Sequence, residues 1–194
     1  MGKTIVHFTD LFIIITALSL KVRFRQINRR IVINIKKNPN LYFWKSVRED
    51  YDQLVRFVVK LDNEFSYMIL SSVGFNCFWI VKLLYNSLRF VEERESVNFL
   101  YSFGFLLFRF VSVFESCILL NNESKKPSFI IQFSDLPTTH NVEIMRLLEQ
   151  IEFDSAYFSG YHFFRIKNGI ILSVWFKNFD IEYPLKMYFR LRVL

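Results

Sequence analysis

The spacing of long apolar stretches is the feature that most limits what this chain can fold into. Charged segments separate the apolar stretches, which occupy residues 4–20, 66–88, 97–120 and 161–176. A helix needs about 20 apolar residues to cross about 30 Å of hydrocarbon. The second and third stretches reach this length, whereas the first is short and contains Asp10, and the fourth has Arg165 and Lys167 near its start. The pattern predicts two full spans between two incomplete ones.

The composition agrees with a helical membrane protein. The 194 residues are 52% hydrophobic and include 24 Phe, which is more than one soluble core needs. With only 5 Gly and 4 Pro, a turn-rich β-sandwich is disfavoured. Both cysteines, Cys77 and Cys117, lie in apolar runs, so they do not form a disulfide framework of a secreted module. We therefore expect an all-α, polytopic membrane helical bundle.

The distribution of Lys and Arg predicts the orientation of the spans, because these residues accumulate in cytoplasmic connections. Residues 21–65 carry a dense group of cations and are predicted to be cytoplasmic. Residues 89–96 then form a short extracellular loop, and 121–160 return to the cytoplasm. Residues 161–176 are expected to begin the last transmembrane helix, followed by a tail at 177–194 whose cations lie on the outer side, against the charge rule.

Two cytoplasmic segments show helical periodicity. Apolar residues recur at steps of three and four between Val47 and Phe65, which predicts an amphipathic helix over 45–65 that continues into the second span. The same spacing between Ile144 and Ile151 predicts a helix over 141–155, with Asn141 among its possible caps. The two extensions can pack together below the membrane, or each can be an ordinary surface helix.

Several segments resemble one family. The most specific are Trp44, the run Arg48-Glu-Asp-Tyr51 and the run Glu123-Ser-Lys-Lys-Pro127, in the family's order and at roughly its spacing. On these residues the chain resembles insect gustatory receptors, within the sugar-receptor group related to the trehalose receptor. The resemblance covers about residues 5–174.

The resemblance implies a partial seven-transmembrane insect chemoreceptor fold with cytoplasmic helical extensions. Residues 1–20 would be the end of the fourth helix and 161–176 the start of the seventh. Relatives in the family assemble as tetrameric, ligand-gated cation channels, so it implies a sweet taste receptor subunit in the plasma membrane of a gustatory neuron. A sugar, membrane lipid and other receptor subunits in a homo- or hetero-tetramer would be its partners. It implies no cofactor and no enzymatic activity.

The chain departs from the family after Val174. The seventh-helix signature is replaced by a run that begins Trp175-Phe-Lys-Asn-Phe-Asp. We hypothesise that residues from about 175 are translated intron or frame-shifted sequence. Since the last helix lines the pore in relatives, the alternative function is a non-conducting partial or mis-spliced product of a gustatory receptor gene. A third reading, a small transporter or membrane enzyme, predicts inverted repeats or intramembrane acid and histidine pairs, and the sequence reveals neither.

Ionisable side chains within the spans are candidates for function, because charges at membrane depth are costly. They are Lys82, Arg109 and Glu115. Lys82 can instead extend its stem to the interface. Arg109 and Glu115 are six residues apart and point about 120° apart on a helix, so we expect no pairing within it.

A sugar site needs polar side chains for hydroxyls and aromatic faces for the ring. The outer halves of the second and third spans offer the ligand-binding candidates Asn76, Trp79, Tyr85, Asn86, Tyr101 and Ser102. Each can equally be a packing or interfacial residue. Because earlier helices line the pocket in relatives, we do not expect this chain to complete a pocket alone.

Other chemistry has little support in the sequence. His7, His140 and His162 lack partners at metal-ligand spacing, so no metal site is predicted. Phosphate-binding and nucleophile motifs are missing from the sequence. The net charge of +7 reflects the juxtamembrane cations, which topology and anionic lipid explain better than nucleic acid.

Overall fold

The computed structural model describes residues 2–35, 37, 39–87, 93–134, 142–154, 156–161 and 163–166. These residues form the helices α1 (Gly2–Ile35), α2 (Leu41–Ser87), α3 (Glu93–Gln132) and α4 (Val142–Phe153), and the short strands β1 (Ser159–Gly160) and β2 (Phe164–Arg165). The predicted tail at 177–194 and the greater part of the predicted last helix, 167–176, lie outside the described residues.

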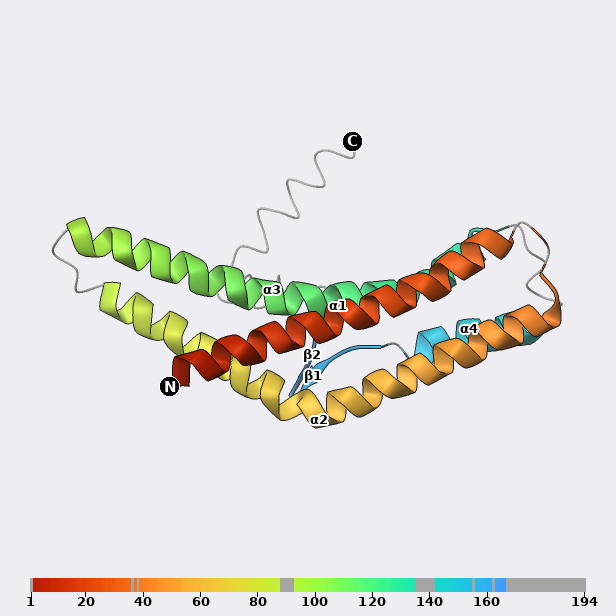
Figure 1. Ribbon diagram of the computed structural model, residues 1–194, viewed down its shortest axis with the longest axis horizontal. Helices are drawn as coiled ribbons and strands as arrows, with labels where there is room; N and C mark the ends of the chain where they lie inside the picture. The colour runs from red at the N-terminus through yellow and green to blue at the C-terminus, as the bar shows by residue number, and fades with distance from the viewer. Residues whose placement is uncertain are drawn as a thin grey trace, which may run out of the picture.

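The three long helices form an elongated bundle (Figure 1). α1 packs chiefly against α3 and also contacts α2, while α4 contacts both α2 and α3. α4 lies beside the N-terminal half of α2, at the end of the bundle that the charge pattern predicts to be cytoplasmic (Figure 1). The strands lie between α2 and the other long helices, where α2 bends (Figure 1).

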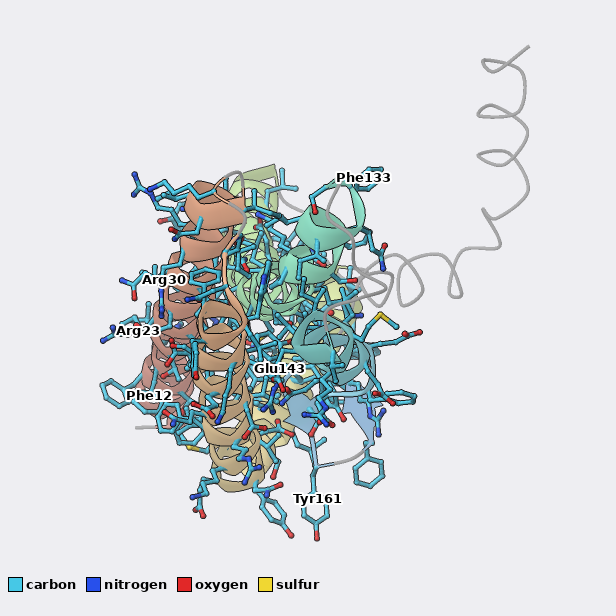
Figure 2. The ribbon with its side chains drawn as sticks, turned by 90° about the vertical axis from the view of Figure 1, so that its right-hand side faces the viewer. Phe12, Arg23, Arg30, Phe133, Glu143 and Tyr161 are labelled. Atoms are coloured by element: carbon cyan, nitrogen blue, oxygen red, sulfur yellow. The ribbon has the colours of Figure 1, made fainter. Side chains whose placement is uncertain are left out.

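α1 is longer than the sequence predicted. Residues 21–35 were expected to belong to a cytoplasmic loop, but they continue the helix of the first apolar stretch to Ile35. The reason is a buried stripe that does not stop at the charged residues: Ala17, Leu20, Phe24, Ile27 and Ile31 recur every three or four positions and are all buried. The cations between them lie on the outer side of the same helix, as Arg23 and Arg30 do in Figure 2.

α2 confirms the prediction of one unbroken helix that runs from residues 45–65 into the second apolar stretch. It begins after Pro39-Asn40, and the Asn40 side chain accepts a hydrogen bond from the backbone N–H of Phe43 at 3.1 Å, as a helix cap does. α4 confirms the helix predicted over 141–155, although its predicted cap Asn141 lies outside the described residues. Ile144, Leu147 and Ile151 form its buried face.

Among the described residues, two helices are long and apolar enough to cross a membrane, at Leu41–Tyr85 and Phe99–Gln132. Only 17% and 28% of their most apolar windows are buried inside the structure. A core helix of a soluble protein would bury most of such a surface. The exposed side chains include Phe75, Phe78, Phe105 and Phe108, so these helices present apolar surface suited to lipid.

The described residues at the start of the fourth apolar stretch are not helical. Residues 161–176 are predicted to begin the last transmembrane helix, but residue 161 and residues 163–166 form a turn and strand β2, which pairs antiparallel with β1. A Cβ atom at Gly160 would lie 2.4 Å from the Phe164 ring, so a larger residue at this position would displace that ring. Tyr161 at the turn adopts a positive φ of 46°, which few non-glycine residues do. Turn geometry and ring packing therefore outweigh the hydropathy that favoured a helix.

Candidate functional site

A group of polar side chains joins the three long helices within their apolar portion. We call it the polar cluster and define it as His7 and Asp10 of α1, Ser72 and Asn76 of α2, and Arg109 of α3. Asp10, Ser72 and Asn76 are buried. Positions 72 and 76 continue the stripe of α2 that faces the other helices, because each lies one helical turn beyond a buried residue. The cluster therefore lies inside the bundle, away from the lipid-facing surface.

The Asp10 carboxylate is the centre of the cluster. Its Oδ1 accepts a hydrogen bond from the Ser72 hydroxyl, and its Oδ2 accepts one from Asn76 Nδ2 at 3.3 Å. Arg109 Nε lies 2.7 Å from the same Oδ2. The Nε–H is not directed at that oxygen, so this contact is an ion pair rather than a hydrogen bond. An isolated carboxylate in an apolar interior is very costly, and these partners offset that cost.

The guanidinium of Arg109 on α3 contacts side chains of both α1 and α2. Besides Asp10, it donates through Nη2 to Asn76 Oδ1 and through Nη1 to His7, whose Nε2 lies 3.3 Å away. The planar fork of an arginine allows several such contacts at once. As expected from their helical spacing, Arg109 pairs across helices and not with Glu115, which is exposed.

Sequence reasoning did not predict a functional role for two members of the polar cluster. It treats Asp10 only as a charge that shortens the first apolar stretch, and it considers His7 only as a possible metal ligand. Their separation of three residues places both on one face of α1, which was a usable signal. Their partner on α3 lies about a hundred residues away in the chain, and no local pattern marks such a contact.

The structure brings together some of the predicted ligand-binding residues and separates others. Asn76 contacts Arg109 in the polar cluster. Trp79 is half-buried, and the Lys82 ammonium lies 4.7 Å from the centre of its ring. The side chains of Tyr85, Tyr101 and Ser102 are exposed, and Asn86 lies where only the backbone of α2 is described. The predicted residues whose side chains the structure describes therefore do not converge on one enclosed pocket.

The polar cluster offers the chemistry of hydroxyl recognition. A carboxylate, an amide, a hydroxyl, an imidazole and a guanidinium together supply both hydrogen-bond donors and acceptors in a small volume. Low water access strengthens each hydrogen bond relative to bulk solvent. The Ser72 hydroxyl donates to the Asp10 carboxylate, which also pairs with Arg109, so these contacts link α1, α2 and α3.

A second set of buried contacts fixes the end predicted to be cytoplasmic. The Asp62 carboxylate of α2 accepts hydrogen bonds from the Ser159 N–H at 2.6 Å and the Ser159 hydroxyl at 2.7 Å. Asn121 of α3 donates to the Ala156 carbonyl at 2.8 Å. The chain just before and within β1 is thus held by two different helices.

Contacts among the helices at this end are equally specific. The Tyr51 hydroxyl donates to the Ser124 carbonyl at 3.2 Å, and burial, with a contribution from Asp154, raises the pKa of this tyrosine. Glu143 of α4 accepts from Arg48 of α2, with Nε and Oε2 2.7 Å apart. Figure 2 shows Glu143 in the middle of the end view, between helices. These bonds make this end a single packed unit.

Among the cavities at this end, two lie away from the Arg48–Glu143 contact. One of about 590 Å³ lies between α2 and the segment after α4, with Asp52, Lys60 and Tyr157 in its lining. The other, of about 450 Å³, is an open groove between α1 and α2 beside Arg30 and Phe57. Neither cavity includes a member of the polar cluster in its lining.

Comparison with known proteins places this architecture in a family. The family profile described as trehalose receptor matches residues 4–176, which includes the polar cluster and every described helix except the first residues of α1. The chain belongs to the trehalose receptor family. The resemblance to insect sugar receptors is thereby confirmed, and the family is one of receptors rather than enzymes.

The chain is also similar to several gustatory receptors of Drosophila melanogaster. "Gustatory receptor for sugar taste 64b" is 31% identical over 170 residues, which cover 86% of this chain and 41% of that protein. "Gustatory receptor 5a for trehalose" is 22% identical over 168 residues, covering 86% and 38%. "Gustatory receptor for sugar taste 64f" is 25% identical over 169 residues, covering 87% and 36%. This trehalose receptor family chain therefore spans about two fifths of the length of the relatives it matches.

Proposed function

We propose that this chain is a subunit, or part of one, of a sugar-gated cation channel in insect taste neurons. The observation that carries the proposal is the polar cluster, a connected set of hydrogen-bonding groups inside the bundle of a trehalose receptor family member. The relatives named for sugar taste and for trehalose support a sugar as the ligand. The seven-helix fold, the tetramer and the plasma-membrane location in a gustatory neuron are proposed from the same family membership.

In the proposed mechanism, a sugar enters from the outer side and its hydroxyls engage the amide of Asn76. The Asn76 side chain is hydrogen-bonded to both Asp10 and Arg109. A sugar that forms hydrogen bonds with this amide therefore replaces bonds that join the three helices. A ligand shifts a closed-to-open equilibrium only by binding one state better than the other. The polar cluster supplies such a difference, because its bonds join α1, α2 and α3 to one another.

Sugar-evoked cation current in transfected cells tests the proposal. The chain is expressed alone and together with a full-length sugar gustatory receptor, and surface biotinylation confirms its amount at the membrane. We expect trehalose-dependent current that Asn76→Leu reduces at least tenfold in sensitivity, about 1.4 kcal/mol of ligand binding. Ser71→Ala is the matched control on α2, since the Ser71 hydroxyl is exposed and donates to the Met68 carbonyl of its own helix at 3.0 Å.

Two results would contradict the proposal. A surface-expressed chain that adds no current in either setting would favour the alternative, a non-conducting partial product of a gustatory receptor gene. Equal sugar sensitivity of the wild type, Asn76→Leu and Ser71→Ala would leave the channel in place and remove the polar cluster from ligand recognition.

A further inference from the structure

The turn between β1 and β2 carries an aromatic group that the proposed function does not use. Tyr161 is 41% exposed, Phe163 is 77% exposed, and Tyr67 on α2 is 60% exposed. The rings of Tyr67 and Tyr161 are 4.1 Å apart, and those of Tyr161 and Phe163 are 6.4 Å apart. Figure 2 shows Tyr161 projecting away from the bundle at its lower edge. Three large rings from two distant segments thus form one outward-facing surface, which we call the aromatic patch.

The aromatic patch lies where α2 changes from charged to apolar sequence. Asp62 and Glu64 are the last acidic residues of the charged part, and residues 65–81 contain no Asp, Glu, Lys or Arg. At a rise of about 1.5 Å per residue, this uncharged stretch spans about 25 Å, close to the hydrocarbon thickness. Tyr67 is its third residue. The rings therefore lie at the level of a membrane boundary.

The segment that carries Tyr161 and Phe163 is fixed to α2 at this level. Ser159 is bound twice by the Asp62 carboxylate, one turn and a residue before Tyr67. Within the turn, the Phe163 N–H donates to the Gly160 carbonyl at 3.0 Å, and the Ile166 N–H donates to the Phe158 carbonyl at 2.9 Å. The exposed rings are thus presented by a hydrogen-bonded turn rather than by a loose loop.

The surroundings of the aromatic patch match the headgroup layer of a bilayer. Tyrosine is enriched at that depth because its ring is apolar and its hydroxyl is polar. Towards the membrane, the patch continues into the exposed apolar surface of α2 at Phe75 and Phe78. The guanidinium of Arg165 lies 5.0 Å from the ring of Tyr157, which lines a cavity together with Lys60, and it carries the charge that lipid phosphates attract.

We propose that the aromatic patch is a membrane anchor, in which Tyr67, Tyr161 and Phe163 insert into the lipid headgroup layer on the side predicted to be cytoplasmic. The anchor sets the depth of the chain segment that follows α4. It requires α2 to cross the membrane but does not require sugar binding or conduction.

Site-directed spin labelling of the reconstituted chain tests the anchor. In a Cys77→Ser, Cys117→Ala background, a nitroxide is attached at Phe163→Cys, and the chain is placed in nanodiscs of phosphatidylcholine and phosphatidylserine. Phe78→Cys is the control in the apolar part of α2, and Met145→Cys is the control on α4, since both side chains are also exposed and apolar. Power saturation then compares accessibility to oxygen, which enters lipid, with accessibility to a water-soluble nickel chelate.

We expect the ratio of oxygen to nickel accessibility at position 163 to lie between those at positions 78 and 145. A ratio at 163 equal to that at 145 overturns the anchor, because the turn would then lie in water. Low accessibility to both reagents also overturns it, because protein and not lipid would cover the patch. If the ratio of oxygen to nickel accessibility at position 78 equals that at position 145, α2 does not cross the membrane, and the proposal fails with it.

A measurement on the unmodified chain guards against damage by the cysteine replacements. A gadolinium chelate attached to lipid headgroups broadens resonances of groups near that layer. We expect the Phe163 ring to be broadened several-fold more than the Met145 methyl group. Equal broadening of the two would contradict the anchor.

Discussion

Arg109 of α3 and Asp10 of α1 form an ion pair across 99 positions of sequence, with Nε 2.7 Å from Oδ2. The Asp10 side chain has no exposed surface, and that of Arg109 is 12% exposed. Ser72 and Asn76 of α2 complete the coordination of the same carboxylate. One buried charge pair thus links the three long helices.

Breaking this pair from one side should destabilise the bundle strongly. Asp10→Asn leaves the Arg109 charge buried without its counter-charge, and such changes cost about 3–5 kcal/mol. We expect the same scale for Arg109→Gln. The double variant should lose less than the sum of the two, with a coupling of about 0.5–3 kcal/mol. The free energy of unfolding in mixed micelles, titrated with a denaturing detergent, measures all three.

An additive double variant, within about 0.5 kcal/mol of the sum, would show that the two charges do not interact in the folded chain. Ser112→Ala serves as the control on α3, because its hydroxyl donates to the Phe108 carbonyl of its own helix. It should change the free energy of unfolding by no more than about 0.5 kcal/mol.

Asp62→Ala should release the strand β1 from α2. The substitution removes the two carboxylate oxygens that accept hydrogen bonds from Ser159. The buried N–H and hydroxyl of Ser159 then have no acceptor, and each unsatisfied group costs about 1–3 kcal/mol of stability. Hydrogen exchange of the Ser159 amide should accelerate at least tenfold. Asn63→Ala, at the next and exposed position, is the control and should leave that exchange unchanged. Equal exchange rates in the two variants would mean that Asp62 does not hold the strand.

The docking of α4 should weaken in acid. The hydrogen bond and charge of Arg48, aided by Arg146 and opposed by burial, lower the pKa of Glu143 below its ordinary value of 4.5. A lowered folded-state pKa contributes stability that is complete above the unfolded-state value and is lost as the pH falls through the folded-state value. Protection of α4 amides from exchange, corrected for intrinsic rates, should therefore fall below pH 4.5.

Two variants identify the group responsible for that pH dependence. Glu143→Gln should lower the protection of α4 at neutral pH and remove its acid-dependent loss. Glu149→Gln, at an exposed position of the same helix, should retain the loss. An unchanged acid response in Glu143→Gln would assign the titration to another group.

The long helices could be predicted wherever burial followed a regular apolar period. The spacing from Val47 to Phe65 predicted the extension of α2 because few charges interrupt that face. The extension of α1 was missed, since the cations of residues 21–30 dominate the sequence there, although Leu20, Phe24 and Ile27 keep the period. The turn at Tyr161 was also missed, because hydropathy counts its aromatic residues as a span and carries no information about turn geometry.

The polar cluster could be predicted only in part. The cost of a charge at membrane depth drew attention to Arg109, and depth in the second span drew attention to Asn76; the structure places both in the polar cluster. Their connection through Asp10 depends on the crossing of helices far apart in the chain. Exposed candidates such as Tyr85 and Tyr101 show the limit of depth as a criterion, since it does not tell which way a helical residue points.

The central claim is that the polar cluster recognises a sugar, and thermal unfolding of the chain copurified with a full-length sugar gustatory receptor, with and without trehalose, tests it most directly. A ligand that binds only the native state stabilises it, by about 2.7 kcal/mol at a hundredfold excess over Kd. Sugars also stabilise proteins by exclusion from their surface, and this effect is common to all variants. We predict that trehalose raises the Tm of the wild type and of Ser71→Ala more than that of Asn76→Leu. Equal increases in all three proteins would contradict the account.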